Sequence, residues 1–409
     1  MRVPALLCGD LNMLRCFCES GVPTSIAASD PEEPTLRSRY ATRRFLIAPA
    51  DQPERCVGDL ELIRAELGDD PVLYYGTDAM LLLVARNAER LAERFRFRTP
   101  ALELVEALVD KIQFAALAQA RGIPIPETLS SSEAFSARQV ARSVPLPCVV
   151  KPSVHIGWLK ERALRQRSVQ KAIVAHTLAE LDAVLDEVRE HTRSFVVQRY
   201  VPGGEDEIHS FHAYADARAR VLGWFVGKKI RTYPMQAGVS TYLELVKEPE
   251  LARLGHQIVE RLGLVGPVKI DFKRDADTGG WWVLELNPRF TLWNYLGAVS
   301  GVNLPKLAYA DLTGEDAPLP NDYRTGVRWL SFGNDLRSFV RDYRPSGALS
   351  TLDYLTSLRG PKVYDVFSWS DPMPWVSSAL RYSRAAARRW LGSEAPRGNN
   401  QDVACATPS

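Results

Sequence analysis

Two oxygen-bearing side chains, Glu285 and Asn287, stand two residues apart at the end of an apolar run. The run over 281–286 predicts a β-strand, and side chains two positions apart lie on the same face of a strand. Leu284 and Leu286 then take the opposite face and can be buried. A carboxylate and an amide oxygen would therefore project side by side from one face of this strand.

A second carboxylate, Asp271, is expected to lie opposite or diagonal to Glu285. The run over 268–273 predicts the preceding strand, and the composition of 275–280 predicts the hairpin turn that joins the two. Opposite residues of a hairpin lie a few ångströms apart, so without a cation one of the two carboxylates would have to hold a proton. Hard oxygen ligands of this kind suit Mg²⁺ that keeps waters and bridges phosphates. An alternative interpretation is a solvated sheet face on which acidic residues occur by chance.

Basic residues earlier in the chain could bind phosphate. Lys151 ends a predicted apolar strand over 147–151, where a purely structural lysine is unusual. Lys111 begins a predicted helix over 110–121, where a solvated lysine is an equally good interpretation. A third cluster follows a predicted strand and could face phosphate, or could simply discourage pairing of an exposed sheet edge: Lys228, Lys229 and Arg231.

The segment Glu285-Leu286-Asn287-Pro288-Arg289, together with Asp271, resembles the ATP-grasp superfamily. The likeness is greatest to its carboxylate–amine ligase branch, which includes carbamoyl phosphate synthase-like and D-aspartate ligase-like proteins. The resemblance implies that Asp271, Glu285 and Asn287 hold two Mg²⁺ ions, or Mn²⁺, against the phosphates of ATP. It also implies that Arg289 steadies the transferred phosphoryl group, a task of positioning and charge neutralisation.

The same resemblance assigns roles to other residues. Lys111 faces ATP, Lys151 binds the α-phosphate, and Glu205 takes the ribose hydroxyls. Lys228 and Arg231 are the candidates for a catalytic role beside Arg289. The linker expected to contact the adenine consists of Gln198, Arg199, Tyr200 and Val201. Many family members carry a glycine-rich flap after the strand lysine, whereas Ser153 to Gln170 contains one glycine and four basic residues: Lys160, Arg162, Arg165 and Arg167.

The pattern of strands and helices predicts a mixed α/β and α+β protein. Residues 1–109 alternate strand with helix, which predicts a parallel sheet covered by helices. The resemblance implies a Rossmann-like pre-ATP-grasp domain at 1–109, followed by the ATP-grasp lid subdomain at 110–193. The subdomain with the metal site is expected at 194–312. Residues 313–409 form a C-terminal extension without clear periodicity, and its tail from about 393 is expected to be disordered.

Composition and net charge argue against several other classes of protein. With 51 basic and 49 acidic side chains the net charge is +2, which gives no reason to expect nucleic-acid binding. The six cysteines are scattered, which predicts idle thiols in a reducing compartment. No signal peptide and no apolar run long enough to span a bilayer is visible, so we expect a cytoplasmic protein.

One stretch near the C-terminus could contact a membrane. Trp375 to Leu391 predicts a helix that carries arginines and tryptophans, which could lie on an anionic membrane surface. Packing of this helix against the body, with its arginines in solvent, is the favoured interpretation. His209 and His212 resemble a zinc pair, but on a strand they point to opposite faces, which argues against a shared metal.

The family likeness implies an ATP-dependent ligase. A carboxylate would be activated as an acyl phosphate and joined to an amine, with amino acids among the candidate substrates, and a homo-oligomer is compatible with the family. Two alternatives remain open. One is another ATP-grasp transfer of the kinase or carboxylation type, and the other is a non-catalytic ATP-binding scaffold at a membrane.

Overall fold

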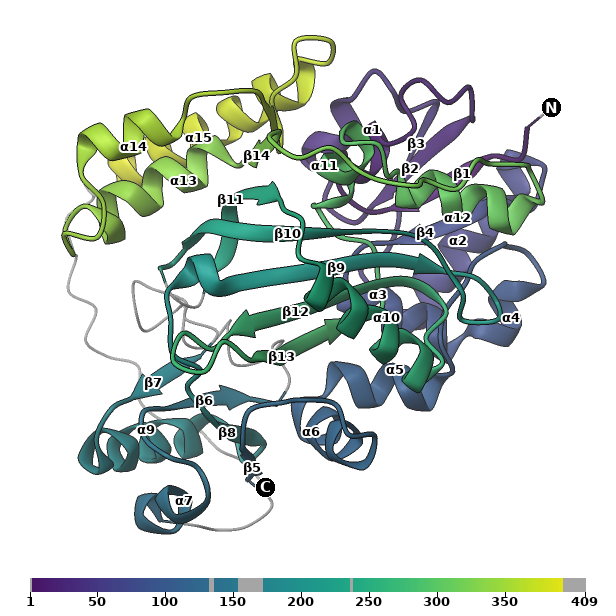
Figure 1. The fold of residues 1–409 in the computed structure, drawn as a ribbon. Helices are drawn as coiled ribbons and strands as arrows, with labels where there is room; N and C mark the ends of the chain where they lie inside the picture. The colour runs from purple at the N-terminus through teal and green to yellow at the C-terminus, as the bar shows by residue number, and fades with distance from the viewer. Residues whose placement is uncertain (1, 132–135, 154–171, 236–237, 393–409) are drawn as a thin grey trace, which may run out of the picture.

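The computed structural model describes residues 2–131, 136–153, 172–235 and 238–392, which form three β-sheets with flanking helices (Figure 1). The N-terminal sheet is parallel throughout, in the order β3-β2-β1-β4. Its strands are β1 (Ala5–Cys8), β2 (Thr24–Ala28), β3 (Arg43–Leu46) and β4 (Val72–Tyr75). The predicted parallel sheet is therefore confirmed.

Side-chain caps mark the start of two helices that follow strands of this sheet. Asp10 caps α1 (Leu11–Arg15) by accepting a hydrogen bond from the backbone N–H of Met13. Thr77 caps α3 (Asp78–Arg86) by accepting a hydrogen bond from the backbone N–H of Met80. The other elements of this region are η1 (Pro34–Arg37), α2 (Pro53–Leu67), α4 (Ala88–Ala92) and α5 (Leu102–Val109).

The middle sheet is antiparallel, in the order β5-β8-β6-β7. Its strands are β5 (Thr128–Ser130), β6 (Cys148–Pro152), β7 (Ile173–Ala175) and β8 (Phe195–Arg199). Helices α7 (Ala137–Ser143) and α9 (Leu178–His191) cover its outer face, and α6 (Lys111–Ala120) leads into it (Figure 1). Asp110 and Thr177 cap α6 and α9.

The central sheet has seven strands, in the order β13-β12-β9-β10-β11-β14-β15. Its strands are β9 (Ile208–Ala215), β10 (Val221–Tyr233), β11 (Val239–Leu245), β12 (Gly266–Arg274), β13 (Trp281–Asn287), β14 (Arg328–Leu330) and β15 (Lys362–Tyr364). The short helix η2 (Glu205–Glu207) precedes β9. Helix α10 (Pro249–Leu262) packs its apolar stripe on one face, where Ile270 and Phe272 are fully buried. Asp271 projects from the opposite face, because side chains alternate along β12.

A second apolar core joins the N-terminal sheet to the central sheet. Tyr74 of β4 packs against Phe290, with ring centroids 5.3 Å apart, and both belong to one buried cluster with Phe225 and Trp293. Helices α11 (Asn294–Val299) and α12 (Leu304–Thr313) complete this cluster. The N-terminal sheet is thus fixed against the part of the chain that follows β13.

The C-terminal extension is part of the central sheet. β14 pairs antiparallel with β11, and β15 pairs parallel with β14, so residues beyond 313 supply the last two strands. The remaining elements are α13 (Phe332–Ser338), η3 (Phe339–Tyr343), α14 (Thr351–Ser357) and α15 (Met373–Gly392). The domain boundaries given above remain predictions, and the tail from 393 lies outside the described residues.

Helix α15 packs against the N-terminal region, as the favoured interpretation expected. It contacts η1, and Arg381 forms an ion pair with Asp30, 3.0 Å away, and a longer one with Glu32. None of the helices in the described ranges combines the length and the hydropathy needed to cross a membrane.

Candidate active site

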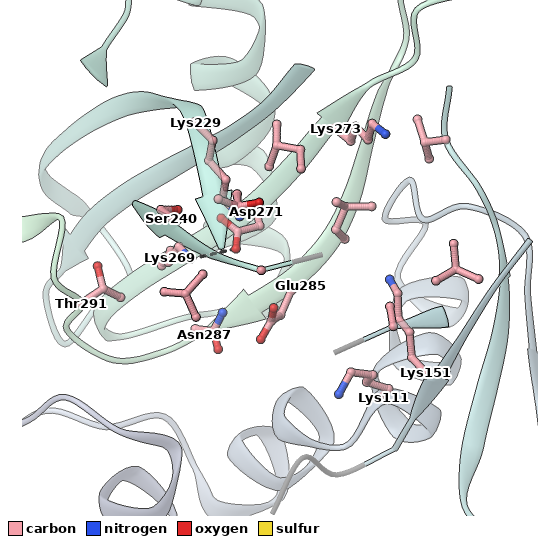
Figure 2. A pocket seen from close by; sticks show the side chains of 18 of the residues that line it. Lys111, Lys151, Lys229, Ser240, Lys269, Asp271, Lys273, Glu285, Asn287 and Thr291 are labelled. Atoms are coloured by element: carbon pink, nitrogen blue, oxygen red, sulfur yellow. Dashed lines mark hydrogen bonds and ion pairs between the residues drawn. The ribbon is translucent and has the colours of Figure 1, made fainter. Parts of the chain in front are cut away.

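A cavity of about 350 Å³ lies between the middle sheet and the central sheet. Figure 2 shows lysines from the middle-sheet side facing the carboxylates of β12 and β13 across this space. Ten of the residues predicted for the site line it: Lys111, Lys151, Gln198, Arg199, Tyr200, Val201, Asp271, Glu285, Asn287 and Arg289. The structure therefore brings together residues that lie as far apart in the sequence as Lys111 and Arg289.

Strands β12 and β13 form the predicted hairpin, and Asp271 lies directly opposite Glu285. The next pair in register is Lys269 with Asn287. Beyond Asp271 the register shifts, so that Phe272 pairs with Val283 and β13 carries Leu284 as an extra residue. This β-bulge turns Leu284 into the cavity, so the prediction that it lies on the buried face is wrong.

The carboxylate of Asp271 is buried and ionised. Its Oδ1 accepts a hydrogen bond from the hydroxyl of Ser210, and its Oδ2 lies 2.8 Å from the ammonium of Lys269. Burial alone would raise the pKa of Asp271, but the charges of Lys269 and Lys229 outweigh it and hold the pKa well below its usual value. The predicted repulsion between facing carboxylates is thus already relieved by lysines.

The remaining oxygens of this edge fit a hard divalent cation. Glu285 and Asn287 present a carboxylate and an amide oxygen from the same face of β13, which is the chemistry that Mg²⁺ prefers. Arg289 donates a long hydrogen bond of 3.4 Å to Oδ1 of Asn287, which orients that amide. Neither this edge nor any other part of the described ranges contains a group of three or more His, Cys, Asp or Glu side chains placed to bind a metal ion.

Two lysines face these oxygens from the other side of the cavity (Figure 2). The ammonium of Lys151 donates a 2.8 Å hydrogen bond to the amide oxygen of Gln198, and that of Lys111 donates to the carbonyl of Ser153 at 3.2 Å. Burial, together with the charge of Lys111, lowers the pKa of Lys151 to about 8. Both cations are suitably placed for phosphate groups that enter the cavity.

The end of β8 and the two residues after it line the cavity, and the side chain of Arg199 has structural partners there. Its guanidinium forms ion pairs with Glu127 and Asp275 at 2.5 and 3.1 Å and lies 4.7 Å above the ring of Trp282. Both ends of the Gln198 side-chain amide have a partner, because its oxygen accepts from Lys151 and its nitrogen donates to the hydroxyl of Thr128 at 2.9 Å.

Arg289 connects the cavity to the N-terminal region. Its guanidinium forms an ion pair with Asp78, the first residue of α3, and also lies 3.4 Å from the carbonyl of Gly76. The pairing keeps Arg289 extended at the edge of the cavity. An anion that reaches this guanidinium has to share it with Asp78.

Three predicted site residues do not line the cavity, and two of them have structural partners. Arg231 is 3% exposed and pairs with Asp335 through two contacts of 2.9 and 2.8 Å, so its assignment as a catalytic residue is corrected to a buried ion pair. Glu205 accepts hydrogen bonds from Thr232, which lines the cavity, and from the hydroxyl of Tyr343, so its carboxylate already has partners. Lys228 is also absent from the lining, although its neighbour Lys229 reaches it.

Three lysines in the cavity were missed or misplaced by the sequence reasoning. Lys269 and Lys273 flank Asp271 at two-residue spacing, so the alternation that placed Asp271 on the cavity face could have placed them there too. Burial lowers the pKa of Lys273 to about 8, and its ammonium lies 4.4 Å above the ring of Tyr200. Lys229 was named within the basic cluster but not as a site residue.

Other expectations concern residues at the margins of the site. The flap basic residues Lys160, Arg162, Arg165 and Arg167 lie outside the described residues.

His212 is sandwiched between Phe225 and Trp293, whereas His209 contacts Trp281, which confirms that the two rings face different surroundings. The cysteines at 8, 16, 18, 56 and 148 are free, as predicted.

Comparison with curated proteins finds distant relatives. No protein-family model matches the chain. The chain is 23% identical over 323 residues to the D-aspartate ligase of Enterococcus faecium, and the match covers 76% of each protein. The chain is similar to ATP-grasp carboxylate–amine ligases. It is also 24% identical over 311 residues to the C-terminal section of the carbamoyl phosphate synthase large chain of Methanopyrus kandleri, of which it covers 53%.

Solved structures with an ATP-grasp fold superimpose on this chain. Biotin carboxylase from Campylobacter jejuni, in complex with β-γ-ATP, superimposes with a TM-score of 0.62 at 15% identity, over 80% of this chain and 74% of that one. The L-amino acid ligase from Bacillus licheniformis gives a TM-score of 0.57 at 15% identity, over 77% and 76% of the two chains. The predicted ATP-grasp fold is therefore confirmed.

Proposed function

We propose that the protein is an ATP-dependent carboxylate–amine ligase that forms an amide or peptide bond through an acyl phosphate. The observation that supports this most is the cavity in which Glu285 and Asn287 face Lys111 and Lys151. One side offers oxygen donors and the other offers ammonium groups. A nucleoside triphosphate needs both, because its phosphates bind ammonium groups and the metal ion that accompanies them binds oxygen ligands.

The nucleotide would lie along the middle-sheet side of the cavity. The adenine would meet the backbone of 198–201, and Lys151 and Lys111 would neutralise phosphate charge. Glu285 and Asn287, with Asp271 beside them, would hold Mg²⁺, which would supply neutralisation of phosphate charge. Mn²⁺ has the same ligand preferences and is a suitable replacement.

The reaction would proceed in two substitutions. A carboxylate oxygen of the first substrate attacks the γ-phosphorus and the bond to the β-phosphate oxygen breaks, which yields an acyl phosphate and ADP. The amine nitrogen of the second substrate then attacks the acyl carbon, inorganic phosphate leaves, and the nitrogen gives up a proton. Arg289 is positioned to hold the transferred phosphoryl group, and enclosure between the two sheets keeps water from the acyl phosphate.

The test is ADP release with magnesium and ATP, measured against pairs of amino acids. Glu285→Gln should lower turnover by at least about a thousandfold, because a metal ligand and its charge are lost where phosphoryl transfer depends on charge neutralisation. Glu260→Gln, the same change on the exposed side of α10, is the matched control. Wild-type turnover in Glu285→Gln would refute the proposal.

The same assay separates the alternatives. ADP release that needs an amine as well as an acid supports the ligase. Release with a phosphorylated product that persists supports a kinase, and dependence on bicarbonate supports a carboxylation-type step. Nucleotide binding without any turnover would favour a scaffold.

A further inference from the structure

The side chain of Lys269 lies within the group of oxygen donors that would bind metal. It precedes Asp271 by two residues on β12 and therefore projects from the same face, directly opposite Asn287 in register. Its ammonium lies 2.8 Å from Oδ2 of Asp271, and the two side chains are 15% and 8% exposed. Figure 2 shows this contact as a dashed line beside Glu285 and Asn287.

The pairing uses the carboxylate that was expected to bind one of two metal ions. Oδ1 of Asp271 accepts a hydrogen bond from Ser210, and Oδ2 is paired with Lys269. A divalent cation on Asp271 would lie next to the ammonium, and like charges at such short range in a buried site repel strongly. A cation site on Asp271 is thus already taken by a side chain.

The charge balance leads to the same result. Lys269 forms an ion pair with Asp271 inside the group, so one of its two carboxylates is already matched by a positive charge. Lys229 adds a further positive influence on Asp271 from β10. A site with this balance suits one divalent ion beside Glu285 and Asn287 better than two.

We propose that Lys269 replaces one of the two divalent cations, so that the protein binds its nucleotide with a single divalent ion held by Glu285 and Asn287. This inference rests on the proposed function, because it requires that a nucleotide binds in this cavity. In it, Asp271 anchors the ammonium of Lys269 and does not ligate the metal. Lys269 supplies its positive charge whenever the protein is folded, and this charge does not depend on the concentration of free metal ions.

The test counts Mn²⁺ ions bound per protein at saturating ADP, using the electron paramagnetic resonance signal of free Mn²⁺. The wild-type protein should bind one ion. Lys269→Met keeps a side chain of similar length but removes the charge, which frees Asp271, and should bind two. Lys273→Met removes a charge at the same spacing on the other side of Asp271, and should still bind one.

Each outcome bears on the inference. Two ions in the wild-type protein would overturn it, and so would a single ion in a folded Lys269→Met variant. If Lys269→Met does not fold, Asp271→Asn provides the second measurement. Its Mn²⁺ affinity should stay within about threefold of the wild type, whereas a loss of tenfold or more would identify Asp271 as a metal ligand and overturn the inference.

The two proposals can fail separately. A wild-type protein that binds no adenine nucleotide, with or without Mn²⁺, refutes the proposed function and removes the basis of the inference. A protein that binds ADP together with two ions refutes the inference alone.

Discussion

The protonation of Lys151 should control how tightly the protein binds nucleotide. This lysine is buried beside Lys111, and its pKa is lowered to about 8. A bound phosphate would stabilise the charged form and raise that pKa again. Affinity for ADP should therefore be constant below pH 8 and should fall as the pH rises above it, because the free protein then loses a proton that the complex retains.

The size of this effect follows from the pKa. With a value of about 8, roughly nine-tenths of Lys151 is protonated at pH 7 and about one-tenth at pH 9. ADP affinity should thus fall about tenfold per pH unit above 8. Lys273 also has a pKa of about 8 and lines the same cavity, so if it contacts phosphate the decline approaches a hundredfold per unit.

Isothermal titration of ADP in excess Mg²⁺ from pH 7 to 9.5 measures this dependence. Lys151→Met should bind ADP about 10- to 100-fold more weakly at pH 7, since a hydrogen bond to a charged group contributes about 1.5–3 kcal/mol. The variant should also lose one unit from the slope of log Kd against pH. Lys306→Met, on the exposed side of α12, is the control and should match the wild type.

Either of two results would refute this reasoning. One is an ADP affinity that stays constant up to pH 9.5. The other is a Lys151→Met variant whose affinity declines with pH as steeply as that of the wild type, since the titrating group would then lie elsewhere.

Two further predictions concern stability and thiol reactivity. Arg231→Met should lower the free energy of unfolding by about 3–5 kcal/mol in urea titrations, because it leaves the fully buried carboxylate of Asp335 without its partner; a change below 1 kcal/mol would contradict the buried ion pair. In a Cys405→Ser background, Ellman's reagent should modify Cys18 in the native protein, since the other four cysteines are buried. The rate of modification should rise with pH as the thiolate of Cys18 forms, because partial burial and the charge of Glu19 raise the pKa of this thiol. Modification of several thiols at once would contradict the burial of the other four cysteines.

The strand pair of the site could be predicted from sequence because it is a local structure. A hairpin of two apolar runs joined by a short polar turn has its register set by the turn, and alternation then decides which side chains share a face. This was sufficient to place Asp271 opposite or diagonal to Glu285, and the structure shows the two directly opposite. The bulge at Leu284 escaped this reasoning, because one extra residue in a strand leaves the apolar pattern almost unchanged.

Long-range partners explain most of the errors. Arg231 looked like a candidate for phosphate binding because its counter-ion, Asp335, lies 104 residues further along the chain. Glu205 is similarly engaged by Tyr343, which is 138 residues away. Such pairings depend on how the C-terminal extension folds back, and no local pattern in the sequence indicates it.

Short elements were the other source of error. β14 and β15 have three residues each, too few to show a period, and β2 was missed although four of its five residues are buried. Lys269 and Lys273 were accessible to the same alternation argument as Asp271. They were overlooked because lysines on a strand are usually taken to be solvated.

The two ends of the described chain depend on each other for their shape. The guanidinium of Arg15, at the end of α1, is 2% exposed and donates to the carbonyls of Tyr364, Asp365 and Val366, just beyond the last strand of the central sheet. In a chain shortened to residue 312, β11 would become an exposed edge strand that other molecules could pair with. The buried guanidinium of Arg15 would also lose the carbonyls that it binds. The terminal segments therefore hold the described fold closed, and the chain cannot be shortened to residue 312 without exposing a sheet edge and a buried cation.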